Sequence, residues 1–322
     1  MVSPADLPAV RDVSVVVPTH NRRELLASTL KTILWQRDTN LEVVVVDDGT
    51  RDPDVVPQVI ADLADDRVVL VRNTVPTGVS AARNLGIATA RGSWVAFCDD
   101  DDLWAPDKLA LQLAAARSTG RGWVYTGAVK IDLNQHVIGG LPPPAPEVAL
   151  ARLPHANPIP GGCSGVLASA AALRQAGGFD SGLVNLADWD MWMRLALTGP
   201  PAFVPQPLVA YRIHPLNASR DTALILAEAR SLDQRYGSRL DYGALYHYLA
   251  WVHLRSGRGR SAVRFYALAA THGTFGAPMA DLWWKLRERL GVDGFDLPGQ
   301  RRQKVLRAEW RAASEAWLCV LR

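Results

Sequence analysis

Four short apolar runs, separated by helical segments, constrain the fold of this chain more than any other feature. The runs lie at residues 13–17 (VSVVV), 41–46 (LEVVVV), 68–71 (VVLV) and 93–98 (SWVAFC). Near-continuous valine is typical of strands that are buried on both faces of a sheet. The intervening segments with helical character lie near residues 25–34, 53–64 and 78–90. This alternation predicts an α/β fold with a doubly wound, mainly parallel sheet flanked by helices.

Polar residues follow three of these strands directly. The segment PTHN (residues 18–21) follows the first strand, Asp47 and Asp48 follow the second, and Asp99–Asp102 follow the fourth. In open α/β sheets, ligands bind beyond the carboxyl ends of the strands. We therefore expect these three loops to meet at one rim and to form a binding site there.

The four consecutive aspartates have two interpretations. Adjacent ionised carboxylates repel one another, so the cluster is costly unless a cation or hydrogen-bond donors offset its charge. Hard oxygen ligands of this kind suit Mg²⁺ or Mn²⁺ held together with substrate phosphates. The alternative is a solvated acidic turn that caps the helix beginning near Pro106, and the cluster alone does not decide between the two.

The pattern changes to helices after about residue 221. We expect an α/β domain over residues 1–220 and an all-α region over residues 221–322, with two helices between 246 and 270 broken at Ser256–Gly259. The final segment, 303–321, carries Trp310 and Trp317 among arginines. Its apolar side chains either pack on the domain or form a membrane-surface or partner-binding helix.

Composition excludes several function classes. The net charge is only +3, and no basic run with interleaved aromatic residues appears in the first 200 residues, so a nucleic-acid partner is not expected. The three cysteines are far apart and form neither a disulfide framework nor a CxxC metal motif. The first residues lack the apolar core of a signal peptide, and no apolar run reaches the roughly 18 residues of a membrane span. We therefore expect a cytoplasmic protein, with peripheral attachment to the inner face of the membrane kept open.

Five motifs occur in order between residues 12 and 215. They are VSVVVPTHNR (13–22), VVVVDDGT (43–50), GVSAARNLGI (78–87), WVAFCDDDDLW (94–104) and GGFD with ADWDMWMRLA (177–196). In this order and spacing the chain resembles the family-2 inverting glycosyltransferases of GT-A fold. The resemblance implies an enzyme, hexosyltransferase-like, that transfers a sugar from a nucleotide-sugar donor.

The resemblance implies the donor site residue by residue. The loop of Pro18, Thr19, His20 and Asn21 would hold the base and ribose together with the acidic pair that follows the second strand. Thr19, His20 and Asp48 would contact the base, with Asp47 supporting the loop. A carboxylate suits uracil or thymine because it accepts their imino N–H, so a UDP- or dTDP-sugar is favoured. Arg83 would face the nucleotide or its phosphates. The alternative for Asp47 and Asp48 is an ordinary Asp-Gly turn without a ligand. The alternative for Arg83 is a surface arginine beside a packed helix.

The family's metal-binding DxD motif falls on Asp99, Asp100 and Asp101. The resemblance implies that Asp101 binds Mn²⁺ or Mg²⁺ and that Asp99 or Asp100 reaches the ribose or a metal-bound water, with Asp99 a second candidate ligand. The family more often has a small polar residue at the middle position. Asp102 would support the cluster.

By the same resemblance, Asp188 is the catalytic base that deprotonates the acceptor. The alternative is a helix N-cap, and Ala187 stands where the family usually has a glutamate. In the segment 211–220, His214 could bind the metal, and Arg212 or Arg220 could offset phosphate charge. Arg194 is expected to brace the region near Asp188. Cys163 and Ser164 lack a nucleophile-elbow context and are expected to line the acceptor side of the cleft.

Three functional hypotheses follow. The first is a metal-dependent inverting glycosyltransferase whose acceptor is a glycan, a lipid-linked saccharide or a small-molecule aglycone. The second is a sugar nucleotidyltransferase, which should have a glycine-rich phosphate loop where Pro18–Asn21 stand. The third is a non-catalytic nucleotide-sugar-binding protein. A dinucleotide-dependent oxidoreductase is excluded because no GxGxxG follows Val17. The helical C-terminal region is open to acceptor binding or to homo-oligomer formation.

Overall fold

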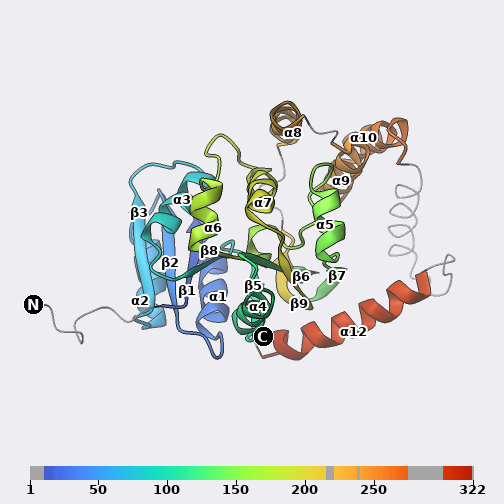
Figure 1. Cartoon of the computed structure of the whole chain (residues 1–322). Coiled ribbons are helices and arrows are strands. Elements are labelled where there is room, and N and C mark those ends of the chain that lie inside the picture. Colours follow the sequence, from blue (N-terminus) through green and yellow to red (C-terminus); the bar gives the residue numbers. More distant parts are fainter. Residues whose placement is uncertain (1–10, 215–220, 238–239, 275–299, 321–322) are drawn as a thin grey trace, which may run out of the picture. The chain divides into compact units, whose positions relative to one another are not determined.

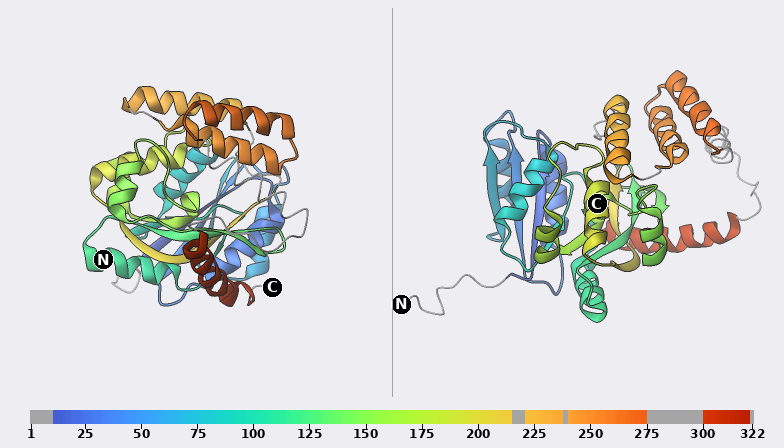
Figure 2. Two further views of the ribbon diagram at one scale, coloured as in Figure 1. Left: turned by 90° about the vertical axis from the view of Figure 1, so that its right-hand side faces the viewer. Right: turned by 45° about the horizontal axis from the view of Figure 1, so that its top comes forward.

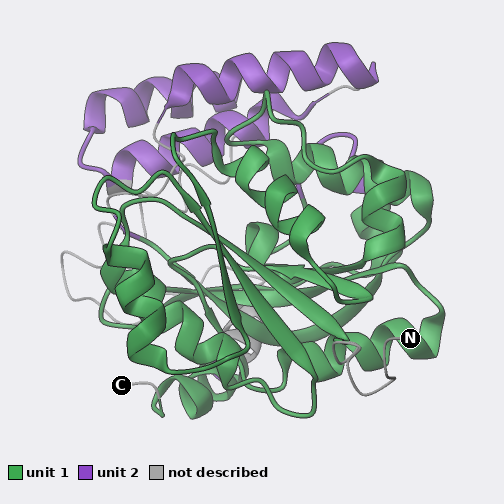
Figure 3. Cartoon of the chain, turned by 90° about the vertical axis from the view of Figure 1, so that its left-hand side faces the viewer, with its two compact units in different colours: residues 1–151, 158–213, 309–322 green, residues 152–157, 214–308 purple. Residues whose placement is uncertain are grey.

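The computed structural model describes residues 11–214, 221–237, 240–274 and 300–320. The chain forms two compact units, coloured separately in Figure 3. The first unit comprises residues 1–151, 158–213 and 309–322, and the second comprises residues 152–157 and 214–308. Arg220 lies outside the described residues, so its expected role is not addressed by the structure.

The N-terminal half of the sheet has the strand order β3-β2-β1-β4, and all its neighbours are parallel (Figure 1). Its strands are β1 (Val13–Thr19), β2 (Leu41–Asp48), β3 (Val68–Asn73) and β4 (Trp94–Phe97). The connecting helices are α1 (Arg23–Leu34), α2 (Val55–Leu63) and α3 (Val79–Thr89). These elements are the ones expected from the valine runs. β1 continues through Pro18 rather than ending there, because Pro18 lies beyond Val16, where pairing with β4 ends.

Helices cover both faces of this half. Odd-numbered positions of β1 and β2, among them Val15 and Val43, join one core cluster with Leu26 and Leu30 of α1. The opposite face approaches α3 so closely that a Cβ on Gly86 would lie 2.2 Å from a methyl carbon of Val16. Burial on both faces is the reason for the uninterrupted valine pattern.

The C-terminal half of the sheet continues the order with β8-β6-β9-β5, and β7 pairs with β6 at the side. Parallel and antiparallel pairs both occur here, since β6 runs parallel to β9 but antiparallel to β7 and β8. Figure 2 shows the curl of the sheet. The strands are β5 (Leu103–Trp104), β6 (Trp123–Ile131), β7 (Val137–Leu141), β8 (Val166–Ser169) and β9 (Ala202–Arg212). The helices are α4 (Lys108–Thr119), α5 (Pro146–Arg152), a 3₁₀ turn η2 (Gly162–Gly165), α6 (Ala170–Ala176) and α7 (Ala187–Thr198).

The end of the chain belongs to the first unit. Helix α12 (Gln300–Leu318) packs Trp317 and Leu318 into a core cluster with Val124 of β6 and Ala210 of β9. Trp310 fills space above Gly127, where an added Cβ would lie 2.2 Å from the indole ring. The expectation that this helix packs on the domain is therefore confirmed for its described side chains.

The described part of the second unit contains three helices in sequence, α8 (Thr222–Tyr236), α9 (Tyr242–Arg255) and α10 (Gly259–Thr271). The break between α9 and α10 falls at the predicted Ser256–Gly259. Aromatic contacts join these two helices, such as Tyr246 against Phe265 with ring centroids 6.1 Å apart.

Candidate functional site

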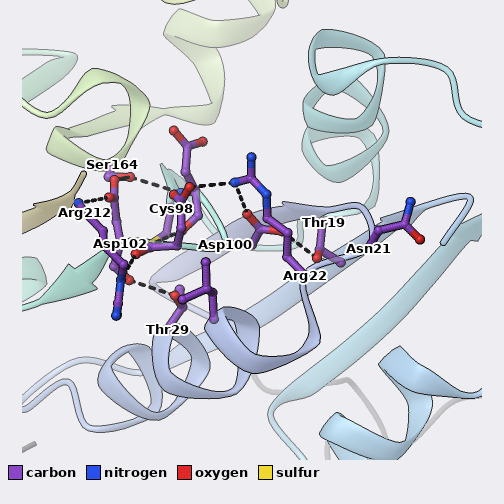
Figure 4. Close-up of polar contacts among 12 residues, drawn as sticks. Thr19, Asn21, Arg22, Thr29, Cys98, Asp100, Asp102, Ser164 and Arg212 are labelled. Atoms are coloured by element: carbon purple, nitrogen blue, oxygen red, sulfur yellow. Dashed lines mark hydrogen bonds and ion pairs between the residues drawn. The ribbon is translucent and has the colours of Figure 1, made fainter. Parts of the chain in front are cut away.

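The four aspartates form a tight turn where β4 ends (Figure 4). The Cys98 amide still donates to the Val16 carbonyl (3.0 Å), and the Asp102 amide then donates to the Asp99 carbonyl (3.1 Å). Asp100, Asp101 and Asp102 are buried, and only Asp99 keeps a partly exposed side chain, at 28%. A solvated acidic turn is therefore excluded.

Arg22 joins two of these carboxylates. Its Nη1 donates to Asp100 Oδ1 at 3.0 Å and to Asp101 Oδ2 at 2.6 Å, and the Thr19 hydroxyl donates to Asp100 Oδ2 at 2.7 Å. Thr19 was expected to contact the nucleotide base, but its hydroxyl donates a hydrogen bond to Asp100, the second aspartate of the turn. Sequence reasoning gave Arg22 no role, although it is the last residue of the first motif.

Arg83 pairs with the first aspartate. Its Nη2 donates to Asp99 Oδ1 at 2.6 Å, and the guanidinium is buried at the base of α3. Burial acts to lower the pKa of Arg83, but the negative charges of Asp99 and Asp188 and the hydrogen bond to Asp99 outweigh burial and raise it. Arg83 therefore stays cationic beside the cluster.

Asp102 is a buried brace. Its Oδ2 accepts from the Ser164 hydroxyl (2.6 Å), its Oδ1 accepts from the Arg212 amide (3.0 Å), and Ser164 Oγ accepts from the Asp99 amide (3.0 Å). The expectation that Cys163 and Ser164 line the cleft is wrong, because both side chains are buried in the protein. The Arg212 guanidinium donates to the Asp101 carbonyl (2.7 Å), so this arginine supports the aspartate turn from β9.

Burial and mutual repulsion keep the cluster from carrying its full formal charge. Burial and the negative charge of Asp101 raise the pKa of Asp100 to about 7, although Arg22 and Thr19 oppose the shift. Burial and the charges of Asp101 and Asp99 raise the pKa of Asp102 well above its usual range. Cationic partners or partial protonation therefore balance the turn.

The acidic pair at the end of β2 anchors two loops. Asp47 Oδ1 accepts from the Thr50 amide at 2.9 Å, and its Oδ2 lies 3.3 Å from Arg72 Nε, so Asp47 supports its own loop. Asp48 Oδ1 accepts from Asn73 Nδ2 (2.9 Å) and from both the amide and hydroxyl of Thr77 (2.8 Å each). Asp48 Oδ2 accepts from the Gly78 amide at 2.8 Å. Burial would raise the pKa of Asp48, but these donors outweigh burial and lower it.

The loop after β1 lies beside this pair. His20 Nδ1 is 2.8 Å from the Asp48 carbonyl oxygen, and Asn21 Oδ1 accepts from the Arg51 amide at 3.0 Å. His20 and Asn21 are exposed, whereas Pro18 is buried in β1. The structure thus brings the loop after β1 and the loop after β2 together at the rim.

Asp188 belongs to the same electrostatic neighbourhood. It is the second residue of α7, so the N-cap alternative is excluded because Leu186 occupies that position. Asp188 Oδ2 would lie 3.7 Å from a Cβ on Gly162. Against the effect of burial, its negative charge contributes to raising the pKa of Arg83. Arg194 braces this region as expected: it contacts Asp190 and the carbonyl oxygens of Ala176 and Gly178.

The aspartate turn has donor chemistry that fits a divalent cation. Asp99 and Asp101 supply hard carboxylate oxygens, and Arg83 contacts only one oxygen of the partly exposed Asp99. Within the described ranges, no group of three or more His, Cys, Asp and Glu side chains is arranged to hold a metal ion. Mg²⁺ is commonly held by one or two carboxylates plus substrate phosphates, so such a group is not required. His214 is buried and belongs to the second unit, and its metal role stays a prediction.

Comparisons with known proteins agree with this arrangement. A sequence model described as glycosyl transferase family 2 matches residues 14–171. An uncharacterised glycosyltransferase of Haemophilus influenzae is 28% identical over 216 residues, which cover 65% of this chain and 71% of that protein. WfgD of Escherichia coli, described as a UDP-Glc:α-D-GlcNAc-diphosphoundecaprenol β-1,3-glucosyltransferase, is 28% identical over 39% of this chain, which spans about half (49%) of its length.

The fold has a solved counterpart. S. aureus TarS 1-349 in complex with UDP-GlcNAc superposes with a TM-score of 0.56 at 16% identity, over 97% of this chain and 82% of that one. The likeness confirms the GT-A-type fold expected from the sequence. Among the helices of the described ranges, none is both long enough and apolar enough to cross a membrane.

Proposed function

The chain belongs to glycosyl transferase family 2, and on that premise we propose that it transfers a sugar, with inversion, from a uridine or thymidine diphosphate sugar. The observation that carries this proposal is the aspartate turn flanked by Arg22 and Arg83, with the charge of Asp188 acting on Arg83. The turn's carboxylates, the two arginines and Asp188 would thus lie near the rim where α/β sheets bind their ligands.

The two arginines give the site its affinity for a diphosphate. Guanidinium groups bind phosphate oxygens through charge-assisted hydrogen bonds. Arg22 is the better placed of the two to move, because its side chain is 23% exposed while that of Arg83 is 8% exposed. When bound, Mn²⁺ or Mg²⁺ held by Asp99 and Asp101 would neutralise charge on the leaving diphosphate.

Asp48 favours a base with a single N–H donor. An ionised carboxylate has about four lone-pair sites, two on each oxygen. Three donors converge on Oδ1 and saturate its two sites, whereas one donor contacts Oδ2, so one acceptor site remains, on Oδ2. Uracil and thymine present one imino N–H, whereas guanine presents two adjacent N–H groups that need both oxygens. This count supports a uridine or thymidine nucleotide over guanosine.

The base preference is measurable by calorimetry. We expect UDP to bind at least about tenfold more tightly than GDP in the presence of Mn²⁺, in line with the cost of about 1–3 kcal/mol for leaving the second guanine N–H unpaired. Thr77→Val removes one donor from Oδ1 while keeping the backbone donor, and it should narrow the difference. Equal affinities of the wild-type protein for UDP and GDP would contradict the lone-pair count.

Asp188 is proposed as the base that takes the acceptor proton while the acceptor oxygen attacks the anomeric carbon. A partly exposed carboxylate near Arg83 can remain ionised and reach a bound acceptor. Asp188→Asn keeps the shape and removes the basicity, so sugar transfer or donor hydrolysis should fall about 10²–10⁴-fold. UDP affinity should change less than threefold.

The same variant separates the competing functions. A non-catalytic binder would show no turnover in either protein, and turnover by Asp188→Asn at the wild-type rate would remove Asp188 from its role.

Metal removal tests the role of the divalent cation. EDTA should abolish turnover, and Mn²⁺ or Mg²⁺ should restore it. Full activity in chelator would reject the metal assignment.

The acceptor is proposed to be a saccharide carried on a lipid diphosphate, with the enzyme working at the inner membrane surface. The printed activity of WfgD supports this choice, since that relative acts on a diphosphoundecaprenol-linked sugar. Incubation with radiolabelled UDP-glucose should then label an organic-extractable product. Label that appears only in water-soluble glycan or small-molecule fractions would favour the other acceptor classes.

A further inference from the structure

The GGFD segment (residues 177–180) is held against α3 by a reciprocal pair of hydrogen bonds. Asn84 Nδ2 donates to the Phe179 carbonyl (2.8 Å), and the Phe179 amide donates to Asn84 Oδ1 (2.7 Å). Gly178 has φ of 72°, and a Cβ there would lie 2.7 Å from Asn84 Oδ1. Glycine at 178 thus allows the close approach that places Phe179 beside α3.

The Phe179 ring is fixed on two sides. It is buried, and it meets Phe97 of β4 edge to face, with ring centroids 5.1 Å apart and planes at 89°. The guanidinium carbon of Arg83 lies 5.3 Å from the Phe179 ring centroid. The residue after Arg83 in the sequence, Asn84, therefore clamps the backbone of the aromatic residue that Arg83 contacts.

We propose that Phe179 is a positioning residue whose ring face holds the Arg83 guanidinium against Asp99. Asn84 fixes the position of the ring through its two hydrogen bonds to the Phe179 backbone. The inference rests on the proposed function in one respect, namely that Arg83 serves a bound nucleoside diphosphate. Through Phe179, the segment between α6 and α7 controls a cation on the donor side of the site.

The hydrogen-bond inventory of Arg83 explains why an aromatic ring is needed. Asp99 accepts from Nη2, while the buried Nε has no hydrogen-bond partner within the described residues. The carboxylates of Asp99 and Asp188 offset the charge of the guanidinium but leave the Nε N–H without an acceptor, so a further favourable contact still stabilises it. The negative face of an aromatic ring supplies it, most strongly where water is excluded. Leucine would fill the space but would not offset the charge.

Fluorinated phenylalanines at position 179 test the ring's charge distribution at nearly constant volume. Successive replacement with 4-fluoro-, 3,5-difluoro- and 3,4,5-trifluorophenylalanine weakens the negative face stepwise. Calorimetric UDP affinity in the presence of Mn²⁺ should fall progressively, by about three- to tenfold at three fluorines. Identical UDP affinities across the series would overturn the proposal, because a purely space-filling phenylalanine would behave in this way.

A double-mutant cycle on unfolding tests the same contact without any ligand. Phe179→Leu and Arg83→Met should be coupled by at least about fivefold in the folding equilibrium constant. Phe179→Leu combined with Arg91→Met, which removes an arginine paired with Glu42, should be additive. Additivity in the Arg83 cycle would refute the positioning role. If the wild-type protein binds no nucleoside diphosphate, the proposed function fails, and the unfolding cycle still decides the role of Phe179.

Discussion

The two halves of the sheet are built by different means. In the N-terminal half, consecutive segments form parallel strands, and Val15, Val16 and Val17 are completely buried. In the C-terminal half, strands pair in both directions, polar side chains such as Lys108 and Gln112 are buried, and residues from the end of the chain complete the core. Local order therefore supplies the rim loops that follow β1 and β2, and long-range contacts from Ser164 and Arg212 hold the aspartate turn in place.

The largest effect on stability is expected where the C-terminal half depends on the end of the chain. Trp317 is 8% exposed and packs in the core cluster of β6 and β9. Trp317→Ala should lower the free energy of unfolding by about 3–5 kcal/mol, the range for aromatic-to-alanine changes in cores. Urea denaturation measures the loss. Val320→Ala is the control, because Val320 lies three residues away and is 64% exposed. A loss below about 1 kcal/mol for Trp317→Ala would mean that the sheet is complete without this helix.

The same contrast explains what the sequence could predict. Valine runs and polar strand ends predicted the four parallel strands and the three rim loops, and the family resemblance drew attention to Asp47, Asp99 and Arg83. The pattern did not reveal β5, β7 or β8, because short strands in a mixed sheet lack a clear period and depend on distant partners. The motifs did not reveal the role of Arg22 either. Its ion pairs with Asp100 and Asp101 join residues about 80 positions apart and form only in the folded chain.

Ser164 joins the two halves of the sheet, and its substitution should cause an intermediate loss of unfolding free energy. Its hydroxyl accepts from the Asp99 amide and donates to Asp102 Oδ2, so it links η2 to the end of β4. Ser164→Ala leaves a buried carboxylate with one donor fewer, which should cost about 1–3 kcal/mol of unfolding free energy. Transfer activity should fall as well, because the aspartate turn loses its brace.

Ser118→Ala on the outer side of α4 is the matched control, because its hydroxyl bonds only a carbonyl of its own helix in an exposed position. It should change the unfolding free energy by less than about 0.5 kcal/mol. If the two serine variants have equal stability, the bridge does not hold the halves together.

The smallest change in unfolding free energy is expected at Lys108, where substitution should raise stability rather than lower it. Lys108 is completely buried in the C-terminal half, with Nζ 3.8 Å from the Trp104 ring centroid and 2.7 Å from Gln112 Oε1. Burial lowers the pKa of Lys108 to about 7, opposed by the nearby ionisable Cys98, whose own pKa is raised by burial. Between about pH 7 and 10 the unfolded chain therefore holds a proton that the folded chain lacks, so this group makes stability increase with pH across that window.

Lys108→Met keeps an unbranched side chain that is one atom shorter and removes the titrating amine. We expect it to raise the unfolding free energy by about 1 kcal/mol near pH 7, because no buried charge then needs compensation. The advantage over the wild-type protein should shrink as pH rises toward 10, where the native lysine and its unfolded form approach the same protonation state. Urea unfolding of both proteins at several pH values measures this difference, with Lys31→Met on the exposed face of α1 as the control. A variant that is less stable than the wild-type protein at every pH would show that the amine's contacts with Trp104 and Gln112 outweigh its desolvation, and that polar burial in the C-terminal half is stabilising in its own right.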